Sequence, residues 1–480
     1  MTSIAPTRFL GNPVAQDTVR FLGELGARER QDDYDAAESS RNRKARSTTL
    51  KHEDKHLPPQ KRQALVAKTR ENVRNFVVAS WAIRKHLDWI TSFRFQARTK
   101  DRGFNRALEQ FIEHWSMAAN FDAAGRHGLR RFLRIAEGRR TIDGDFFTLK
   151  LRDGMVQGIE GDRVRNTAFR GHNDTTDLSR FYHGIRTNKA GRAMAYALAT
   201  RTDTGFLHER IVSARHMLPI GYFDRIDQTR GISLFAPALN GLQDVYEGFD
   251  YALAKAKLAQ LIGLIIYSDN KFEGMPSTDG PDTDGDGETD DERYEVQLGD
   301  GPFKLELSGA DRAEFIDPKT PSSEFKNYST LMLMVALKSL DIPYSFFDES
   351  FTNFYGSKGG VLQYVHSCKP KRKDLLEYLV GLTMWRLALA VTGSSPELRP
   401  PRSIDWMDIA FEWIPSGARP WDRHKEASGV LAEIKSGTNS PQDACRELDT
   451  DFYSNVDKIK EAMEYAAEQG VPLEWALQGA

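Results

Sequence analysis

An acidic run at positions 279–293, DGPDTDGDGETDDER, has residue types and a spacing that could coordinate a divalent cation. An EF-hand calcium loop needs oxygen ligands at its positions 1, 3 and 5, a glycine at position 6 and a bidentate Glu at position 12. Position 12 is here Arg293, which repels a cation. The earlier positions and position 9 agree with the pattern: Asp282, Asp284, Asp286, Gly287 and Asp290.

The sequence that follows the run also departs from a calcium loop. RYEVQLGDGPFKLEL, which begins at Arg293, alternates as strands do, whereas an EF-hand continues into a helix. We therefore interpret the run as a flexible acidic surface insertion, because blocks of like charge are usually solvated or bind partners. A weak divalent site, and with it a calcium-regulated interaction protein, stays open as an alternative.

A second motif, HEDKH at positions 52–56, matches the H-E-x-x-H pattern of zinc hydrolases. That pattern places two histidine ligands one helical turn apart, with a glutamate as general base. Here Leu57-Pro58-Pro59 follows immediately, so no long helix with an apolar inner face can support the ligands. Coincidence within a polar linker is the favoured interpretation, and a zinc-dependent hydrolase using His52, Glu53 and His56 is the alternative.

Motifs for nucleotide or acyl chemistry are missing from the sequence. It contains no G-x-x-x-x-G-K-[ST] loop and no G-x-S-x-G elbow, and GSKGG at 356–360 lacks a preceding strand. KPKRK at 369–373 could contact phosphate, but a solvated helix face or an acidic neighbouring subunit explains it equally well. We therefore predict no catalytic residues, no metal and no cofactor, and a protein that is not an enzyme.

Composition describes an ordinary soluble chain of 480 residues with a net charge of −2, not the basic balance of a tight nucleic-acid binder. Its two cysteines, Cys368 and Cys445, form neither a metal spacing nor a disulfide framework, which favours a reducing compartment. No signal peptide is expected. The longest apolar stretches, 258–267 and 381–391, are shorter than the roughly twenty residues that span a bilayer.

Periodicity places these motifs in a mixed α+β chain. Alternating patterns and turn signals predict strands and hairpins within 143–164 and 184–202. Two long helices that flank a small β insert would form a stalk bearing a β tip. The predicted helices are Gln60–Thr91, Asn105–Ala118, Ala123–Gly138, Ala238–Tyr267, Ser322–Leu340 and Val361–Val391, the last interrupted near Pro370, with two or three short helices after Asp422.

The segment QTRGISLFAPALNGLQDVYEGFDYALAKAKLAQLIGLIIYSD, at 228–269, resembles the signature region of lambda-type bacteriophage portal proteins, the head-tail connectors. In that region a Q-x-R-G-x-S turn leads into a long helix. Three further stretches agree in the same order, and the resemblance covers roughly residues 60–470: 144–166, 333–360 and 413–452. The chain departs from the family where Phe354-Tyr355-Gly356 replaces the usual Tyr-Ser-Ser and where the acidic run is an insertion.

The resemblance implies a ring, typically of about twelve subunits, at one vertex of the viral head. Double-stranded DNA would pass through it without sequence specificity, and the chain would be a virion component assembled in the host cytoplasm. Implied partners are other copies of the chain, the terminase large subunit, a head-completion or adaptor protein, and the major capsid and scaffold proteins, with no membrane. Since the chain lacks a P-loop, the terminase ATPase would supply the energy for movement.

The resemblance also implies a segment map and site residues. The DNA-facing residues would be Asn353, Phe354, Tyr355 and Lys358. The partner-docking residues would be Asp282, Asp284, Asp286 and Asp290. The implied segments are a flexible N-terminal segment (1–59), a wing of helices followed by β hairpins (60–237), a stem helix (238–267), a clip with the acidic insertion (268–321), a second stem helix (322–348), a tunnel loop (349–360), a long helix with a return to the wing (361–421) and a helical crown (422–480).

Overall fold

The computed structural model divides into two compact units, which we describe separately. In the described part of the chain, the first unit holds residues 52–58 and 225–228, and the second begins at Pro59 and holds the rest. The structure describes residues 52–167, 169, 171, 175–261, 264–268, 311–315, 323–348, 354–393, 396–417, 423–448 and 450–471.

The first unit is small. Its single described helix, α2 (Glu53–His56), is one turn long. Arg225 holds it by pairing with Glu53 (Nη1–Oε2, 3.2 Å), and the backbone nitrogen of Glu53 donates to Asp227 at 3.2 Å.

The second unit begins with two helices, α3 (Pro59–Asn75) and α4 (Val77–Ile90), where the sequence predicted one helix over Gln60–Thr91. The break lies at Phe76, whose backbone is extended and whose ring is buried against Tyr246 at 5.5 Å between centroids. Burial of this ring in the core explains why the chain turns there although the apolar periodicity continues.

Three more helices complete this region: α5 (Arg102–Trp115), the short α6 (Ala118–Phe121) and α7 (Leu129–Asp143). Asp101 starts α5 by accepting a hydrogen bond from the backbone nitrogen of Phe104 at 2.9 Å, as an N-cap does. The helices predicted over Asn105–Ala118 and Ala123–Gly138 are therefore present, with shifted ends.

Two antiparallel sheets follow. The predicted strand ranges, 143–164 and 184–202, contain four of their six strands, whereas the strands at 205–213 and 217–221 lie outside those ranges. In the first, β2 (Asp145–Lys150) lies between β3 (Val156–Glu160) and β7 (Met217–Gly221). In the second, β5 lies in the middle. The members of the second sheet are β4 (Ile185–Thr187), β5 (Ala193–Thr202) and β6 (Gly205–Ser213).

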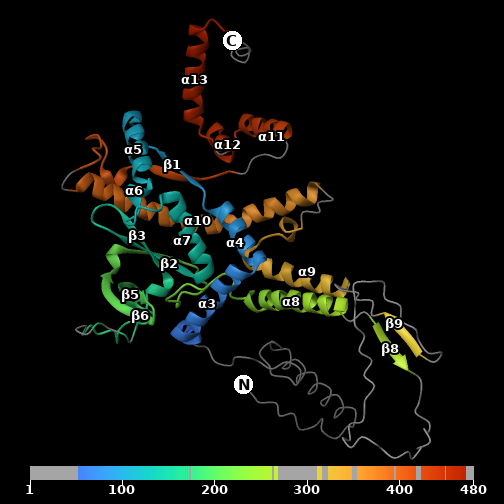
Figure 1. The fold of residues 1–480 in the computed structure, drawn as a ribbon. Helices are drawn as coiled ribbons and strands as arrows, with labels where there is room; N and C mark the ends of the chain where they lie inside the picture. Colours follow the sequence, from blue (N-terminus) through green and yellow to red (C-terminus); the bar gives the residue numbers. More distant parts are fainter. Residues whose placement is uncertain are drawn as a thin grey trace, which may run out of the picture. The chain divides into compact units, whose positions relative to one another are not determined.

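The next helix pair is α8 (Leu239–Leu261) and α9 (Ser323–Leu337), which lie side by side (Figure 1). Phe249 and Phe325 join them edge to face at 5.8 Å. The prediction that the first helix extends to Tyr267 is wrong, because residues 264–268 form β8 and pair with β9 (Asp311–Phe315). The run LIIYS is rich in β-branched residues, which favour a strand once a partner strand is available.

The longest helix, α10, spans Phe354–Thr392 and contains Pro370. The prediction of a helix interrupted near Pro370 is therefore wrong, and residues 354–360, predicted as loop, are helical. Pro370 lies on the exposed side, whereas the opposite side is buried on both sides of the proline, which holds the two halves together. The buried side chains of α10 include Tyr364, Cys368, Leu375, Tyr378, Leu379, Leu382 and Leu387.

These buried residues explain another property of α10. Of the described residues, the helical part Lys358–Thr392 is long and apolar enough to cross a membrane by length and composition, and 44% of its most apolar window is buried inside the protein. The apolar stretch 381–391, which is too short to span a bilayer, is only the C-terminal part of this helix. Many apolar side chains of α10 are buried in the main core, where the helix packs against α4, β7 and β10.

The chain then returns to the first helices through β10 (Phe411–Pro415), which pairs with β1 (Phe93–Ala97). Three C-terminal helices follow, as predicted: α11 (Arg423–Ser436), α12 (Pro441–Glu447) and α13 (Phe452–Glu468). Ser440 and Asp451 cap the last two by accepting from the backbone nitrogens of Asp443 and Ser454.

Candidate functional site

Arg230, the arginine of the R-G-x-S turn, is buried where the two sheets meet α3. Its Nε and Nη2 donate to the two carboxylate oxygens of Asp145 at 2.6 and 2.9 Å. Its remaining protons reach the carbonyl oxygens of Gly161 (2.6 Å), Val164 (2.6 Å) and His183 (2.8 Å). All five guanidinium donors are therefore satisfied, which only an arginine can achieve at this position.

The glycine and serine of the same turn also contact the end of α7 and the start of β2. The backbones of Gly231 and Gly144 approach so closely that a Cβ on Gly231 would overlap the carbonyl oxygen of Gly144. Ser233 Oγ donates to the carbonyl oxygen of Thr141 at 2.9 Å and accepts from the backbone nitrogen of Phe235 at 3.1 Å. The turn is therefore a structural lock between distant segments.

A second arginine shares the same carboxylate. Arg62 of α3 donates from Nη2 to Asp145 Oδ1 at 2.9 Å and to the carbonyl oxygen of Asp143 at 3.3 Å. Burial opposes ionisation of Asp145, but Arg230 and Arg62 together hold the pKa of that carboxyl below its ordinary value. Burial and the neighbouring Arg230 lower the pKa of Arg62 to about 10.

A further ion-pair group lies along the same face of α3. Arg70 forms a fork with Asp143 (2.8 and 2.6 Å) and also reaches Glu160 and Asp162. Arg201 pairs with the same two strand-end acids. Charges of both signs are therefore matched in this group.

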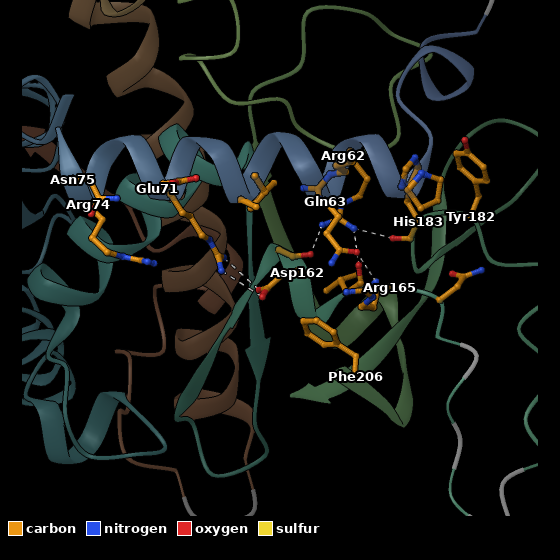
Figure 2. Close-up of a pocket in the computed structure, with 18 residues that line it drawn as sticks. Arg62, Gln63, Glu71, Arg74, Asn75, Asp162, Arg165, Tyr182, His183 and Phe206 are labelled. Atoms are coloured by element: carbon orange, nitrogen blue, oxygen red, sulfur yellow. Dashed lines mark hydrogen bonds and ion pairs between the residues drawn. The ribbon is translucent and has the colours of Figure 1, made fainter. Parts of the chain in front are cut away.

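A cavity of about 530 Å³ lies between α3 and the sheet region. Figure 2 shows Arg62, Gln63 and Arg165 gathered at its centre, with Phe206 on the wall opposite α3. Arg165 donates from Nη2 to Gln63 Oε1 at 3.1 Å, and its guanidinium lies 4.2 Å from the centroid of the Phe206 ring. This cleft was not predicted, although the polar face of α3, with arginines at positions 62, 70 and 74, was a sequence signal for it.

A second buried polar cluster joins four elements of the core. Glu137 of α7 lies 3.1 Å from His86 Nε2 and accepts from Tyr222 OH at 2.5 Å and from Arg140 Nη1 at 3.3 Å. Arg140 also reaches Asp374 of α10. Burial lowers the pKa of His86 and raises that of Tyr222 well above its ordinary value, so both side chains are neutral near pH 7.

The predicted DNA-facing residues fall near the start of α10. Asn353 lies outside the described residues, and Phe354 and Tyr355 are the first two residues of the helix. One turn later, Lys358 pairs with Glu426 of α11 (Nζ–Oε1, 2.9 Å). The predicted docking residues all lie outside the described residues: Asp282, Asp284, Asp286 and Asp290.

Two residues of the KPKRK cluster bind other parts of the same chain. Lys371 binds the carbonyl oxygen of Leu340 at 3.2 Å and Asp341 Oδ2 at 2.8 Å, and Arg372 Nε donates to the carbonyl oxygen of Trp89 at 2.8 Å. Both cations therefore lie at helix C-terminal ends, where positive charge is favourable. The phosphate contact considered for this cluster is accordingly not needed to explain these two residues.

The HEDKH segment does not form the helical pair of ligands that a zinc hydrolase needs. His52 precedes α2 as its N-cap, its Nδ1 lies 3.4 Å from the backbone nitrogen of Asp54, and Glu53 is paired with Arg225. Across the described residues, no group of three or more His, Cys, Asp or Glu side chains could hold a metal ion.

Comparison with known proteins identifies the class. The family model of phage portal proteins of the lambda family matches residues 39–368, which is more than half of the sequence. The chain therefore belongs to the lambda family of phage portal proteins, as the resemblance predicted. No curated protein matches it. The mixed helix and strand composition agrees with the predicted α+β class.

Three solved structures are similar to this chain at low identity. One is from the neck of an empty GTA particle computed with C6 symmetry (10% identity, TM-score 0.46, covering 80% of this chain and 94% of that one). Another is from the virion of a native gene transfer agent particle (11% identity, TM-score 0.45, covering 80% of this chain and 93% of that one). A third is from the neck of a native GTA particle computed with C12 symmetry (10% identity, TM-score 0.47, covering 82% of this chain and 94% of that one).

Proposed function

We propose that this chain forms a ring at one capsid vertex, through which double-stranded DNA is packaged and ejected. Membership in the portal family is the main support. The proposed ring docks the terminase large subunit and head-completion or tail proteins, and it contacts the capsid and scaffold proteins. In this role the chain is a structural component of the virion, assembled in the host cytoplasm, and performs no catalysis.

Exposed apolar side chains on α8 and α9 are the structural observation that favours a ring. Tyr251 is 73% exposed and Val335 61%, on helices that pack against each other through other residues. A monomer rarely leaves so many large apolar groups together in water, and neighbouring copies would cover them. The other exposed members of the set, which leaves out Phe249 because it packs against Phe325, are Tyr246, Leu253, Tyr328, Leu331 and Met334.

The segment assignments follow from this role. We assign α8 and α9 to the stem, the segment between them to the clip, and α11–α13 to the crown. The start of α10, with Asn353, Phe354, Tyr355 and Lys358, would face the DNA. A net charge of −2 suits a channel in which the duplex slides, because strong phosphate pairing repeated around a ring would hold it in place.

The oligomeric state of the purified full-length chain tests the proposal. We expect light scattering to give a mass of many 54.3 kDa subunits and negative-stain images to show annular particles. A variant with Tyr251→Ser and Val335→Ser should shift the particles toward smaller species, whereas Lys369→Ser, exposed on α10, should leave them unchanged. A wild-type chain that stays monomeric at every concentration contradicts the proposal.

A further inference from the structure

The cleft beside α3 contains more positive charge than the described carboxylates neutralise. Arg62, Arg165 and Arg230 all line it, and of the carboxylates in the described part of the chain only Asp145 forms an ion pair with any of them. The neighbouring group around Arg70 is balanced, as described above. The imbalance is therefore local to one end of the cleft.

Unused hydrogen-bond donors lie at the same place. The Arg62 side chain is only 8% exposed, yet its Nε has no acceptor among the described residues. Arg165 Nε is also buried and also has no acceptor among the described residues. Buried guanidinium donors without acceptors are rare in folded proteins, so two of them lining one cavity indicate a missing acceptor group.

The titration behaviour of the two arginines agrees with this excess of charge. Burial and the charge of Arg230 lower the pKa of both Arg62 and Arg165, although the nearby Asp162 partly opposes this effect at Arg165. A bound anion would raise the pKa of both arginines, because its negative charge favours the protonated guanidinium groups and its oxygens accept the unused N–H donors. Arg230 itself has every donor satisfied and therefore acts here through its charge alone.

We propose that the cleft binds a phosphate-type oxyanion beside Arg62 and Arg165, with the side-chain amide of Gln63 as a neutral neighbour. Guanidinium forks match the oxygen spacing of phosphate and form charge-assisted hydrogen bonds with it. The cavity of about 530 Å³ exceeds a single ion, so it also accommodates a phosphate group that belongs to a larger molecule. Free phosphate and a phosphate of the DNA backbone are the two sources of this chemistry.

Thermal unfolding of the full-length chain tests the site. We expect sodium phosphate to raise the melting temperature above that in sodium chloride at equal ionic strength and pH, and the rise to grow with phosphate concentration. Arg165→Gln should weaken phosphate binding about tenfold or more, because a charged hydrogen-bond donor is lost. Arg62→Gln should act in the same direction, but its contact with Asp145 also affects folding, so Arg165→Gln decides the test.

The matched control is Arg192→Gln, which removes the same charge from an exposed position in the same sheet region. It should retain the full effect of phosphate. Equal melting temperatures of the wild type in phosphate and chloride would overturn the proposal, and so would equal losses in Arg165→Gln and Arg192→Gln.

A short DNA duplex distinguishes the two sources. Displacement of bound phosphate by the duplex in the wild type assigns the site to backbone phosphate, and absence of competition assigns it to free phosphate. Both results support the oxyanion site, which does not depend on ring formation.

Discussion

Arg230 and Asp145 form a two-point ion pair in which both side chains are almost fully buried, 3% and 2% exposed. The arginine comes from the loop before α8 and the aspartate from the first residue of β2, 85 positions apart. This pair, rather than any contact with a ligand, explains why the R-G-x-S turn needs an arginine.

Replacing that arginine with lysine should therefore destabilise the fold. A lysine keeps the charge but cannot form the fork or satisfy three carbonyl oxygens, so we expect Arg230→Lys to lower the free energy of unfolding by about 3 kcal/mol. Urea denaturation measures the change. The control Arg192→Lys, on the surface, should stay within about 0.5 kcal/mol of wild type. A similarly small change for Arg230→Lys would show that the buried pair contributes little.

Gly231 makes a second, steric prediction. A methyl group there would overlap the backbone of Gly144, so the two segments would have to separate. We expect Gly231→Ala to lower the free energy of unfolding by about 3 kcal/mol or more, measured by the same denaturation. Gly429→Ala in α11 meets nothing within 4 Å and should be neutral or stabilising by up to about 1 kcal/mol. Equal stability of the two variants would contradict the close approach.

The buried His86 predicts a dependence of stability on pH. Burial lowers its pKa in the folded chain, so below about pH 6.5 the unfolded chain takes up a proton that the folded chain does not. The contribution of neutral His86 to the free energy of unfolding is fully present above pH 6.5, and it is lost as the pH falls toward the pKa of His86 in the folded chain. Between pH 7.5 and 5.5 the wild type should lose about 1 kcal/mol more than His86→Gln, which keeps a donor for Glu137. Parallel pH profiles of the two proteins would show that folding does not lower the pKa of His86.

Lys358 separates a role in DNA movement from a role in folding. Its pair with Glu426 is partly exposed, 37% and 33%, so Lys358→Gln should change the free energy of unfolding by less than about 1 kcal/mol. Under the proposed function the same variant should still form rings but package less DNA into proheads. Lys369→Gln, exposed on the same helix, is the control for the loss of charge. Loss of soluble protein with Lys358→Gln would instead indicate a core role.

The acidic run predicts a docking defect without an assembly defect. Replacing 279–292 with a Gly/Ser linker of equal length should leave ring formation intact, as judged by negative-stain images, and reduce binding to terminase or to a head-completion protein. The reason is that a ring would present many copies of this charge to a basic partner. If rings no longer form, the run belongs to the subunit interface and not to a docking surface.

Local patterns in the sequence were sufficient for several conclusions. Helical and alternating periodicities predicted most helices and the strands β2 to β5 of the two central sheets, because each depends on residues a few positions apart. The strands β6 and β7 of the same sheets were not predicted. The segment 228–269, together with three further motifs in the same order as in the family, predicted the portal family, which the family model confirms. Pro58 and Pro59 predicted that no long helix continues from the HEDKH segment, and α2 does end at His56.

Other features depended on residues far apart in the sequence and therefore required the tertiary structure. Packing on both sides of Pro370 kept α10 continuous, and a partner strand at 311–315 turned 264–268 from helix into strand. The arginines of α3 signalled the cleft only in part, because Arg62 and Arg230 meet at Asp145 only when α3, β2 and the loop before α8 pack together. Periodicity records how each segment buries its own apolar face, whereas the balance of buried charge is decided by which segments come together.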